Sequence, residues 1–292
     1  MIDRICIGTV QFGKEYGISN LYGKTSENEV FKILDFCANK GIQWLDTAED
    51  YGDSQKVLGK YLKSNPGVFK LQSKVSNKSN SSSIKRNFHK TLEELNVEYL
   101  NSYLFHSYEK FKSESYLLAD QIKEIKESGL CLSIGVSLYE DDHALDEKVL
   151  RFSDEIQLPF NLLDNYTNRG EVIKKLLDKR KKIQIRSIFL QGLLLMNFNK
   201  LPKELNDLNQ SLFKIKNIAK RHNMSITELS LYYSFYNMFA DKILLGVETL
   251  QQLKFNLSLI QKSLNQSEDI FFEINEVKVE NKLLLNPSNW NV

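Results

Sequence analysis

The chain has 292 residues, and its 39 Lys and Arg against 37 Asp and Glu give a formal net charge of +2 at pH 7. This near-balance excludes the uniformly basic surface of a general nucleic-acid binder, and the three cysteines and four histidines show no disulfide or metal-ligand spacing. No basic leader and no uncharged apolar stretch of roughly 20 residues is present, so we expect a cytoplasmic protein without nucleic-acid, membrane or metal partners.

Short β-rich apolar runs alternate with helical segments along the whole chain. After the first run, a capping box of Ser26 with Glu29 opens a helix that Gly41 is placed to end. A second capping box, Ser225 with Glu228, lies in the long interval before the last run, which predicts two helices there. The strand-like runs span residues 4–10, 42–48, 69–75, 100–105, 130–136, 155–160, 182–189 and 242–247, and helical segments include 26–41, 57–62, 84–95, 116–128 and 170–181.

The number and spacing of these units predict the fold. Eight strands in 292 residues leave about 36 residues for each unit, the size of a parallel strand–helix–strand crossover. Neither a run of hairpins nor a Pro-, Gly- or Ser-rich linker divides the chain. The sequence therefore predicts an α/β protein in which residues 1–292 form one (β/α)8 TIM barrel, with a C-terminal tail at about 268–292 that holds an extra helix.

Four ionisable residues are expected where successive strands end, at the mouth of the barrel where chemistry takes place. Asp46 ends the second strand and Tyr51 follows it, while Lys74 and His106 lie at the ends of the third and fourth. Singly, each has a structural interpretation as a helix cap, a rim aromatic, a surface lysine or a core histidine. Together, at three neighbouring strand ends, they indicate a catalytic group.

The residues around these four resemble the aldo/keto reductase family. The segment Asp46-Thr47-Ala48-Glu49-Asp50-Tyr51-Gly52 is similar to the motif around that family's catalytic tyrosine, and Lys74 and His106 match its lysine and histidine. Further similarities follow in chain order at residues 8–13, 135–137, 157, 186–192 and 246–256. The resemblance covers residues 2 to about 260.

The resemblance implies an NAD(P)H-dependent oxidoreductase that interconverts an aldehyde or ketone and an alcohol by hydride transfer. Tyr51 would be the proton donor, and Lys74 would lower its pKa. Asp46 would hold Lys74 charged, and His106 would polarise the substrate carbonyl.

The resemblance also implies a set of cofactor contacts. Gly246 and Gln252 stand where many NADPH-specific members have a lysine and an arginine that grip the 2′-phosphate. Glu248 would repel a phosphate, whereas Lys254 would compensate, so NADP(H) is slightly favoured and NAD(H) is possible. The expected cofactor-binding residues are Gly8, Thr9, Asp46, Ser137, Gln157, Arg186, Ser187, Gly192, Gly246, Glu248, Thr249, Gln252 and Asn256.

The expected substrate is a small carbonyl compound or alcohol, possibly a sugar-like, hydroxylated one. Its contacts would be Tyr51, His106, Asn161 and Arg186, although the last two have an alternative role as anchors of loops. Two other functions compete with this one. One is a cofactor-binding regulatory or sensor subunit with slow turnover, and the other is an aldolase that uses Lys74 as a Schiff-base lysine. The sequence does not predict the oligomeric state.

Overall fold

The computed structural model describes residues 1–263 and 266–290, and its eight strands form one closed parallel barrel in chain order. The strands are β1 (Ile5–Gly8), β2 (Trp44–Asp46), β3 (Lys70–Val75), β4 (Ser102–Phe105), β5 (Ile134–Ser137), β6 (Glu155–Pro159), β7 (Lys182–Arg186) and β8 (Lys242–Gly246). Each overlaps the run predicted for it, so the expected (β/α)8 barrel is confirmed. β8 pairs with β1, and Gly8 lies opposite Asp46 on one side and Gly246 on the other.

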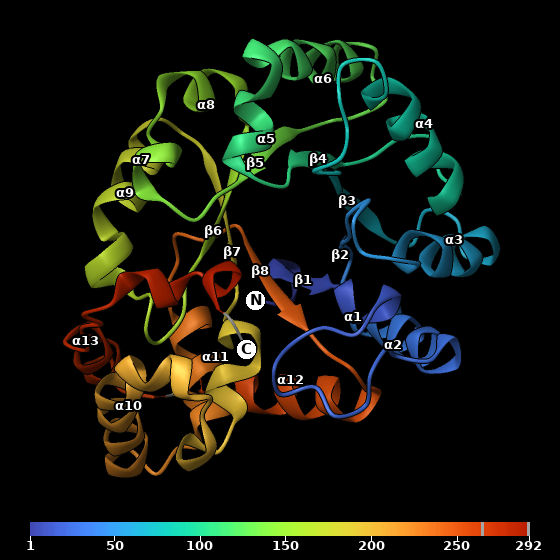
Figure 1. Cartoon of the computed structure of the whole chain (residues 1–292). Coiled ribbons are helices and arrows are strands. Elements are labelled where there is room, and N and C mark those ends of the chain that lie inside the picture. Colours follow the sequence, from blue (N-terminus) through green and yellow to red (C-terminus); the bar gives the residue numbers. More distant parts are fainter. Residues whose placement is uncertain (264–265, 291–292) are drawn as a thin grey trace.

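Helices surround the barrel, as Figure 1 shows. Ser26 and Ser225 are the N-caps of their helices as predicted, because their hydroxyls accept hydrogen bonds from the N–H groups of Glu29 and Glu228. Two helices, α10 (Asn209–Arg221) and α11 (Ile226–Tyr236), precede β8 as expected. The others are α1 (Val10–Gly13), α2 (Glu27–Lys40), α3 (Ser54–Ser64), α4 (Ile84–Leu95), α5 (Tyr108–Lys112), α6 (Leu117–Glu127), α7 (Asp141–Ala144), α8 (Glu147–Phe152), α9 (Tyr166–Asp178), α12 (Leu250–Ser263) and α13 (Asp269–Asn275).

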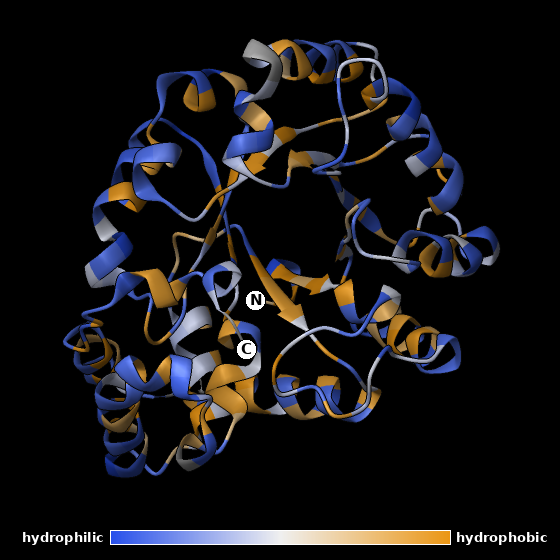
Figure 2. Ribbon diagram, in the orientation of Figure 1, coloured by the Kyte–Doolittle hydropathy of each residue, from blue (hydrophilic) through white to orange (hydrophobic). Residues whose placement is uncertain are grey.

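Apolar residues at helical spacing dock these helices onto the barrel. In α2, Val30, Ile33, Leu34 and Cys37 share one face and are fully buried. Burying one aliphatic side chain of this size contributes about 1.5–3 kcal/mol. Figure 2 shows the same pattern more widely, with hydrophobic β1 and β8 inside and outer helices that alternate between hydrophobic and hydrophilic residues.

The interior of the barrel is unusually polar, because such interiors are mostly filled by Val, Ile and Leu. Gln72, Gln157 and Gln184 are completely buried on β3, β6 and β7. Two buried ion pairs accompany them: Asp46 with Lys74, and Glu155 with Lys242. Gln72 and Lys74 are two residues apart on β3, and Glu155 and Gln157 are two apart on β6. Residues two apart on a strand face the same side of it, which here is the interior of the barrel.

The tail holds the extra helix that the sequence predicts, α13, followed by two short 3₁₀ turns at Lys282–Leu285 and Pro287–Asn289. It is tied to the barrel by Asn165, whose side-chain amide donates to the backbone carbonyls of Ile274 and Val277 at 2.9 and 2.8 Å. Within the described residues, the helices are too short or too polar for any of them to cross a membrane.

Candidate active site

A cavity of about 500 Å³ opens at the carboxyl ends of the strands, and the four predicted catalytic residues all line it. Of the thirteen predicted cofactor-binding residues, all except Thr249 also line it. The structure therefore brings together residues that are spread over most of the sequence.

The loop after β2 is shaped by close packing against α1. A Cβ atom on Gly13 would collide with the backbone carbonyl oxygen of Tyr51, so only glycine lets these two backbones approach. Gly52 follows with a positive φ of 57°, a conformation that glycine adopts without steric cost. The Asp53 N–H then donates to the Gly13 carbonyl at 3.3 Å. These contacts hold Tyr51 at the mouth of the barrel.

Asp46 and Lys74 form an ion pair inside the barrel, where each is 1% exposed. The Lys74 ammonium lies 2.6 and 2.5 Å from the two carboxylate oxygens of Asp46. It also donates to the Thr47 carbonyl at 3.3 Å and to the Tyr51 hydroxyl at 3.4 Å. An ammonium has three N–H groups for these four oxygen atoms, so all of its donors are engaged here. The arrangement connects a buried carboxylate, through one lysine, to a single phenol.

The phenol of Tyr51 is neutral at physiological pH. Burial raises its pKa well above the usual value, the Asp46 carboxylate raises this pKa further, and Arg186 lowers it. The sequence analysis predicts that Lys74 lowers the pKa of Tyr51; the overall shift in this cavity is upward. The ammonium does favour the phenolate, but in this cavity the cost of desolvating a phenolate is larger. Tyr51 therefore keeps its phenolic proton in this cavity.

His106 is also neutral. Burial lowers its pKa to about 3, and the positive charge of Lys74 lowers it as well. Its ring meets the Tyr51 ring edge-on, with 5.5 Å between centroids. The buried Nδ1 atom of His106 has no hydrogen-bond partner within the described residues. The Tyr51 hydroxyl and a neutral imidazole thus face the same cavity as two uncharged polar groups.

Ser137, Gln157 and Arg186 form a second set of contacts at the same mouth. The Ser137 hydroxyl donates to Gln157 Oε1 at 3.1 Å, and Arg186 Nε donates to the Ser137 oxygen at 3.1 Å. The Arg186 guanidinium also donates to Ser187 Oγ and to the Leu138 carbonyl, at 3.2 and 3.1 Å. A guanidinium has five N–H groups, so these bonds leave donors that can face a ligand.

Two predicted contact residues lie elsewhere. Asn161 is 1% exposed and does not line the cavity. Its side chain donates to the Ser187 carbonyl at 3.1 Å and accepts from the N–H groups of Leu163 and Asp164 at 3.0 Å. This geometry matches the loop-anchoring alternative. Thr249 likewise uses its hydroxyl locally, to accept from the Gln252 N–H at 3.1 Å.

The structure adds lining residues that the sequence analysis missed. The Arg186 guanidinium stacks over the ring of Tyr139, 4.0 Å from its centroid. Gln191 accepts from the Ile18 N–H at 3.0 Å, which ties the loop after α1 to the loop after β7. Strand position gave no signal for Tyr139, and Gln191 lies in the segment 186–192 that resembles the family without being predicted as a contact, because contacts between loops bring both residues to the cavity. The additional lining residues include Gln11, Tyr16, Ser19, Leu21, Tyr22, Tyr139, Gln191, Leu195, Thr227 and Phe255.

The end of the cavity formed by β8 and α12 carries negative rather than positive charge. Gln252 accepts from the Glu248 N–H at 2.8 Å and donates back to the Glu248 carboxylate at 3.3 Å. Lys254 does not line the cavity, and its ammonium lies 5.4 Å from the centroid of the Phe36 ring. The two cations among the lining residues, Lys74 and Arg186, come from β3 and β7 instead.

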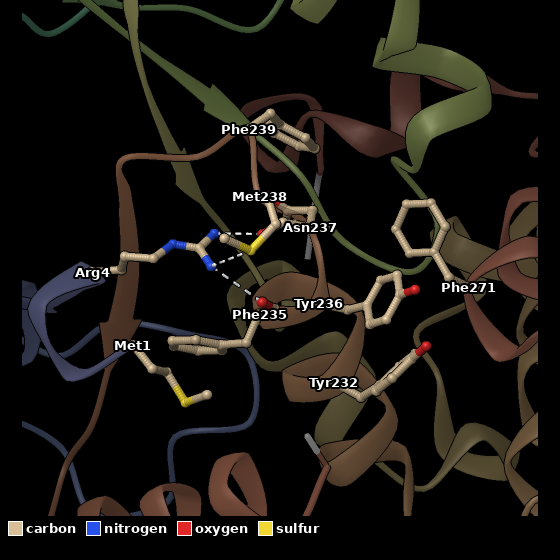
Figure 3. A pocket seen from close by; sticks show the side chains of 9 residues that line it. All are labelled: Met1, Arg4, Tyr232, Phe235, Tyr236, Asn237, Met238, Phe239 and Phe271. Carbon is tan, nitrogen blue, oxygen red and sulfur yellow. Dashed lines mark hydrogen bonds between the residues drawn. The ribbon is translucent and has the colours of Figure 1, made fainter. Parts of the chain in front are cut away.

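A second, larger cavity of about 680 Å³ lies at the amino ends of β1 and β8 (Figure 3). Arg4 donates to the backbone carbonyls of Phe235, Asn237 and Ala240 at 3.2, 2.6 and 3.0 Å, which caps the end of α11. Around it the described residues are aromatic or apolar, apart from Arg4 and Asn237, and provide no carboxylate, lysine or histidine. The acid, lysine and histidine side chains therefore gather in the cavity at the carboxyl ends of the strands. In the part of the chain that the structure describes, no cluster of side chains could hold a metal ion.

Comparisons with known proteins agree with this geometry. The family model for the aldo/keto reductase family matches residues 4–276. A curated relative, the uncharacterized oxidoreductase YqkF of Bacillus subtilis (strain 168), is 24% identical over 267 residues, which cover 83% of this chain and 86% of the relative.

Solved structures show a similar fold. The aldo-keto reductase AKR11C1 from Bacillus halodurans, in its holo form, matches with a TM-score of 0.77 and 19% identity, over 94% of this chain and 92% of that chain. An aldose reductase from Giardia lamblia matches with a TM-score of 0.70 and 16% identity, over 94% of this chain and 91% of that chain. At these identities the likeness concerns the fold alone.

Proposed function

Because the chain belongs to the aldo/keto reductase family and is an NAD(P)-dependent oxidoreductase, we propose that it interconverts a hydroxylated aldehyde or ketone and its alcohol, with Tyr51 as proton donor. The observation that carries this proposal is the chain of contacts from Asp46 through Lys74 to Tyr51, beside a neutral His106, in one cavity. A surface lysine or a packing tyrosine would have no need of a buried carboxylate.

The cavity has features that fit a nicotinamide cofactor. Gly8 and Gly246 lie side by side in it without side chains, and a Cβ on Gly246 would come 3.2 Å from the Gln11 amide nitrogen. Gln11 Oε1 is buried there with no partner in the described part of the chain, which leaves an acceptor for a ligand hydroxyl or amide. Ser137 and Gln157 would hold the carboxamide of the nicotinamide.

The proposed mechanism assigns one task to each side chain. When bound, the cofactor supplies or accepts the hydride. Tyr51 gives its proton to the substrate oxygen, and His106 donates a hydrogen bond to the same oxygen. Lys74 stabilises the phenolate that remains on Tyr51, and Asp46 keeps Lys74 charged and oriented.

The slight preference for NADP(H) that the sequence suggests has little support at the β8–α12 end of the cavity. Glu248 lines this end, Gln252 is engaged with Glu248, and Lys254 lies outside the cavity. A carboxylate accepts hydrogen bonds from a ribose 2′-hydroxyl but repels a 2′-phosphate. We therefore expect NADH to bind at least comparably to NADPH.

The proposed substrate class rests on Arg186 rather than on Asn161. Arg186 retains donors at the mouth, and the hydroxyl-bearing rings of Tyr16 and Tyr139 line the same region. Donors that a ligand leaves unpaired after desolvation cost free energy, so a substrate with hydroxyl groups is favoured over an apolar one.

One experiment tests both parts of this proposal. Wild-type protein and Tyr51→Phe are compared in steady state with matched carbonyl compounds that carry or lack hydroxyl groups. Loss of the proton donor should lower turnover by about 10²–10⁴-fold, while cofactor affinity stays nearly unchanged. Hydroxylated members should have the higher kcat/KM.

Three outcomes would count against it. More than a tenth of wild-type activity in Tyr51→Phe removes Tyr51 from the mechanism. A tenfold advantage of the apolar compounds shows that the polar-substrate assignment is wrong. Tight cofactor binding with one slow turnover of the wild type would instead identify a sensor or regulatory subunit.

A further inference from the structure

Gln184 lies at the centre of a hydrogen-bonded network inside the barrel. Its Oε1 atom accepts from the side-chain amides of Gln72 and Gln157, at 2.9 and 3.0 Å. Its Nε2 atom donates to Gln72 Oε1 at 2.6 Å and to a carboxylate oxygen of Glu155 at 2.5 Å. All three glutamines are completely buried, so solvent does not replace these bonds.

The network reaches the proposed catalytic group mainly through Gln72, and at longer range through Gln157, whose Nε2 atom donates to Asp46 Oδ1 at 3.4 Å. Gln72 Nε2 donates to Asp46 Oδ1 at 2.5 Å, and the same oxygen accepts from the Lys74 ammonium at 2.6 Å. The Asp46 carboxylate thus accepts a hydrogen bond from the Gln72 amide in addition to its ion pair with Lys74. If the Gln72 amide were turned round, its oxygen would face the carboxylate, and the two acceptors would repel each other.

Two buried carboxylates, Glu155 and Asp46, fix the direction of the amides in this network. The Glu155 carboxylate pairs with Lys242 and accepts hydrogen bonds, so the Gln184 amide presents its nitrogen to it. The Gln184 oxygen then faces Gln72 and Gln157, whose nitrogens must point back toward Gln184. The Gln157 oxygen is consequently left to accept from Ser137, as observed at 3.1 Å.

Glu155 is itself held by Lys242. The two side chains are 3.0 Å apart, and both are buried. The Lys242 ammonium lies over the ring of Trp44, 3.5 Å from its centroid, and Trp44 is on the same strand as Asp46. This ion pair is an anchor at the opposite end of the network from the Asp46–Lys74 pair.

We propose that Gln184 is a positioning residue for the reaction: it orients Gln72 against Asp46, and it orients Gln157 at the cofactor end of the cavity. This inference rests on the proposed function. A purely structural interior would not need it, because well-packed apolar residues in place of a buried polar network are often neutral or stabilising. The polar network is therefore explained better by the site that it orients.

The test compares Gln184→Met with Gln72→Met, since methionine has nearly the volume of glutamine and forms none of these amide bonds. Both variants should lower kcat by about tenfold to a hundredfold, the usual effect of losing a hydrogen bond to a charged group. Both should also move the alkaline limb of the oxidation pH profile upward, because Lys74 is then held less firmly beside Tyr51. The double variant should lose less than the product of the two single losses.

Cofactor affinity separates the two variants without any need for turnover. Gln184→Met removes the nearer of the two acceptors that orient the Gln157 amide and leaves only Asp46 Oδ1 at 3.4 Å, so it should weaken NADH binding in a fluorescence titration. Gln72→Met leaves the Gln157–Gln184 bond in place and should bind NADH like the wild type. If Gln184→Met does not fold, Gln184→Asn keeps an amide inside the barrel but withdraws it from its partners by one methylene group. It should then weaken NADH binding in the same direction, while Gln72→Met does not.

Ile185→Val is the matched control, on the same strand and fully buried but outside the network. It should lower stability while kcat and the pH profile stay as in the wild type. The inference is overturned if the Met variants behave like this control, or if both bind NADH equally well. If the wild type transfers no hydride to any carbonyl tested, the proposed function fails, and the difference in NADH affinity still decides whether Gln184 orients Gln157.

Discussion

At the scale of single residues, Glu49 shows how the loop that carries Tyr51 is held in place. Its carboxylate accepts from the Tyr103 hydroxyl, and also from the Ser76 N–H at 3.1 Å. Burial raises the pKa of Glu49 from its usual 4.5 to about 7, although the hydrogen bonds from Tyr103 and Ser76 lower it. The loop after β2 is therefore fastened to the loop after β3 by a carboxyl group that titrates near neutral pH.

Glu49→Gln should remove a pH dependence of stability. The folded protein holds a proton on Glu49 that the unfolded chain releases at lower pH, because the folded pKa is the higher one. Stability is thus fully present below pH 4.5 and is lost as pH rises through about 7. The difference corresponds to at most about 3 kcal/mol.

Urea unfolding at several pH values checks this, with wild type and Glu49→Gln measured side by side. His106 has the opposite sign, since its pKa is lowered to about 3 and it destabilises the fold as pH falls below 6.5. Its contribution is common to both proteins and cancels in the comparison. Parallel pH curves for the two proteins would show that Glu49 does not titrate in this range.

At the scale of elements, the sequence predicts the barrel well because each unit has its own local signal. Eight apolar runs mark the strands, and serine caps mark the starts of α2 and α11. The first run ends earlier than predicted, because Val10 belongs to α1, where Phe12 is fully buried. Turn formation there depends on contacts with Asp46 and Ser54, which a local pattern does not contain.

The sequence predicts those residues of the candidate site that lie at the ends of strands. Asp46, Lys74 and His106 could be placed from the strands alone, and the motif added Tyr51. Tyr139 and Gln191 could not be placed in this way, because contacts between loops bring them to the cavity. Asn161 also follows a strand, yet its amide turns back onto its own loop and onto Ser187.

Gly13→Ala should disturb both stability and catalysis, because a methyl group there meets the Tyr51 carbonyl. Forcing extra atoms into a packed site costs about 1–3 kcal/mol, and here the backbone of Tyr51 must move. Gly67→Ala is the control, since Gly67 has a positive φ of 73° with nothing within 4 Å of the added Cβ. It should cost about 1 kcal/mol without any change in kcat.

Chemical unfolding and steady-state kinetics on both variants decide this. Normal turnover in Gly13→Ala, at any stability, would mean that the approach of α1 does not position Tyr51.

At the scale of the whole molecule, the near-balance of charge conceals an uneven distribution inside the cavity. The lining cations, Lys74 and Arg186, come from β3 and β7, whereas Glu248 lines the β8–α12 end. Because a ligand that binds only the folded barrel stabilises all of it, differences in cofactor affinity appear as differences in Tm.

Gln252→Arg should shift cofactor preference toward NADPH. A guanidinium contact to phosphate is worth about 1.5–3 kcal/mol, so the NADPH/NADH ratio of affinities should rise about tenfold or more, as 1.4 kcal/mol corresponds to a factor of ten. In the wild type, NADPH should bind no more tightly than NADH, because Gly246 and Gln252 provide no cation and the Glu248 carboxylate repels the 2′-phosphate. Fluorescence titration gives both Kd values, and the rise in Tm with each cofactor provides an independent measure.

Gln251→Arg, at an exposed neighbouring position, adds the same charge outside the cavity and should leave the ratio of the NADPH and NADH affinities unchanged. A wild-type preference for NADPH above about tenfold, or an equal response of the two arginine variants, would mean that another part of the chain supplies the phosphate contact.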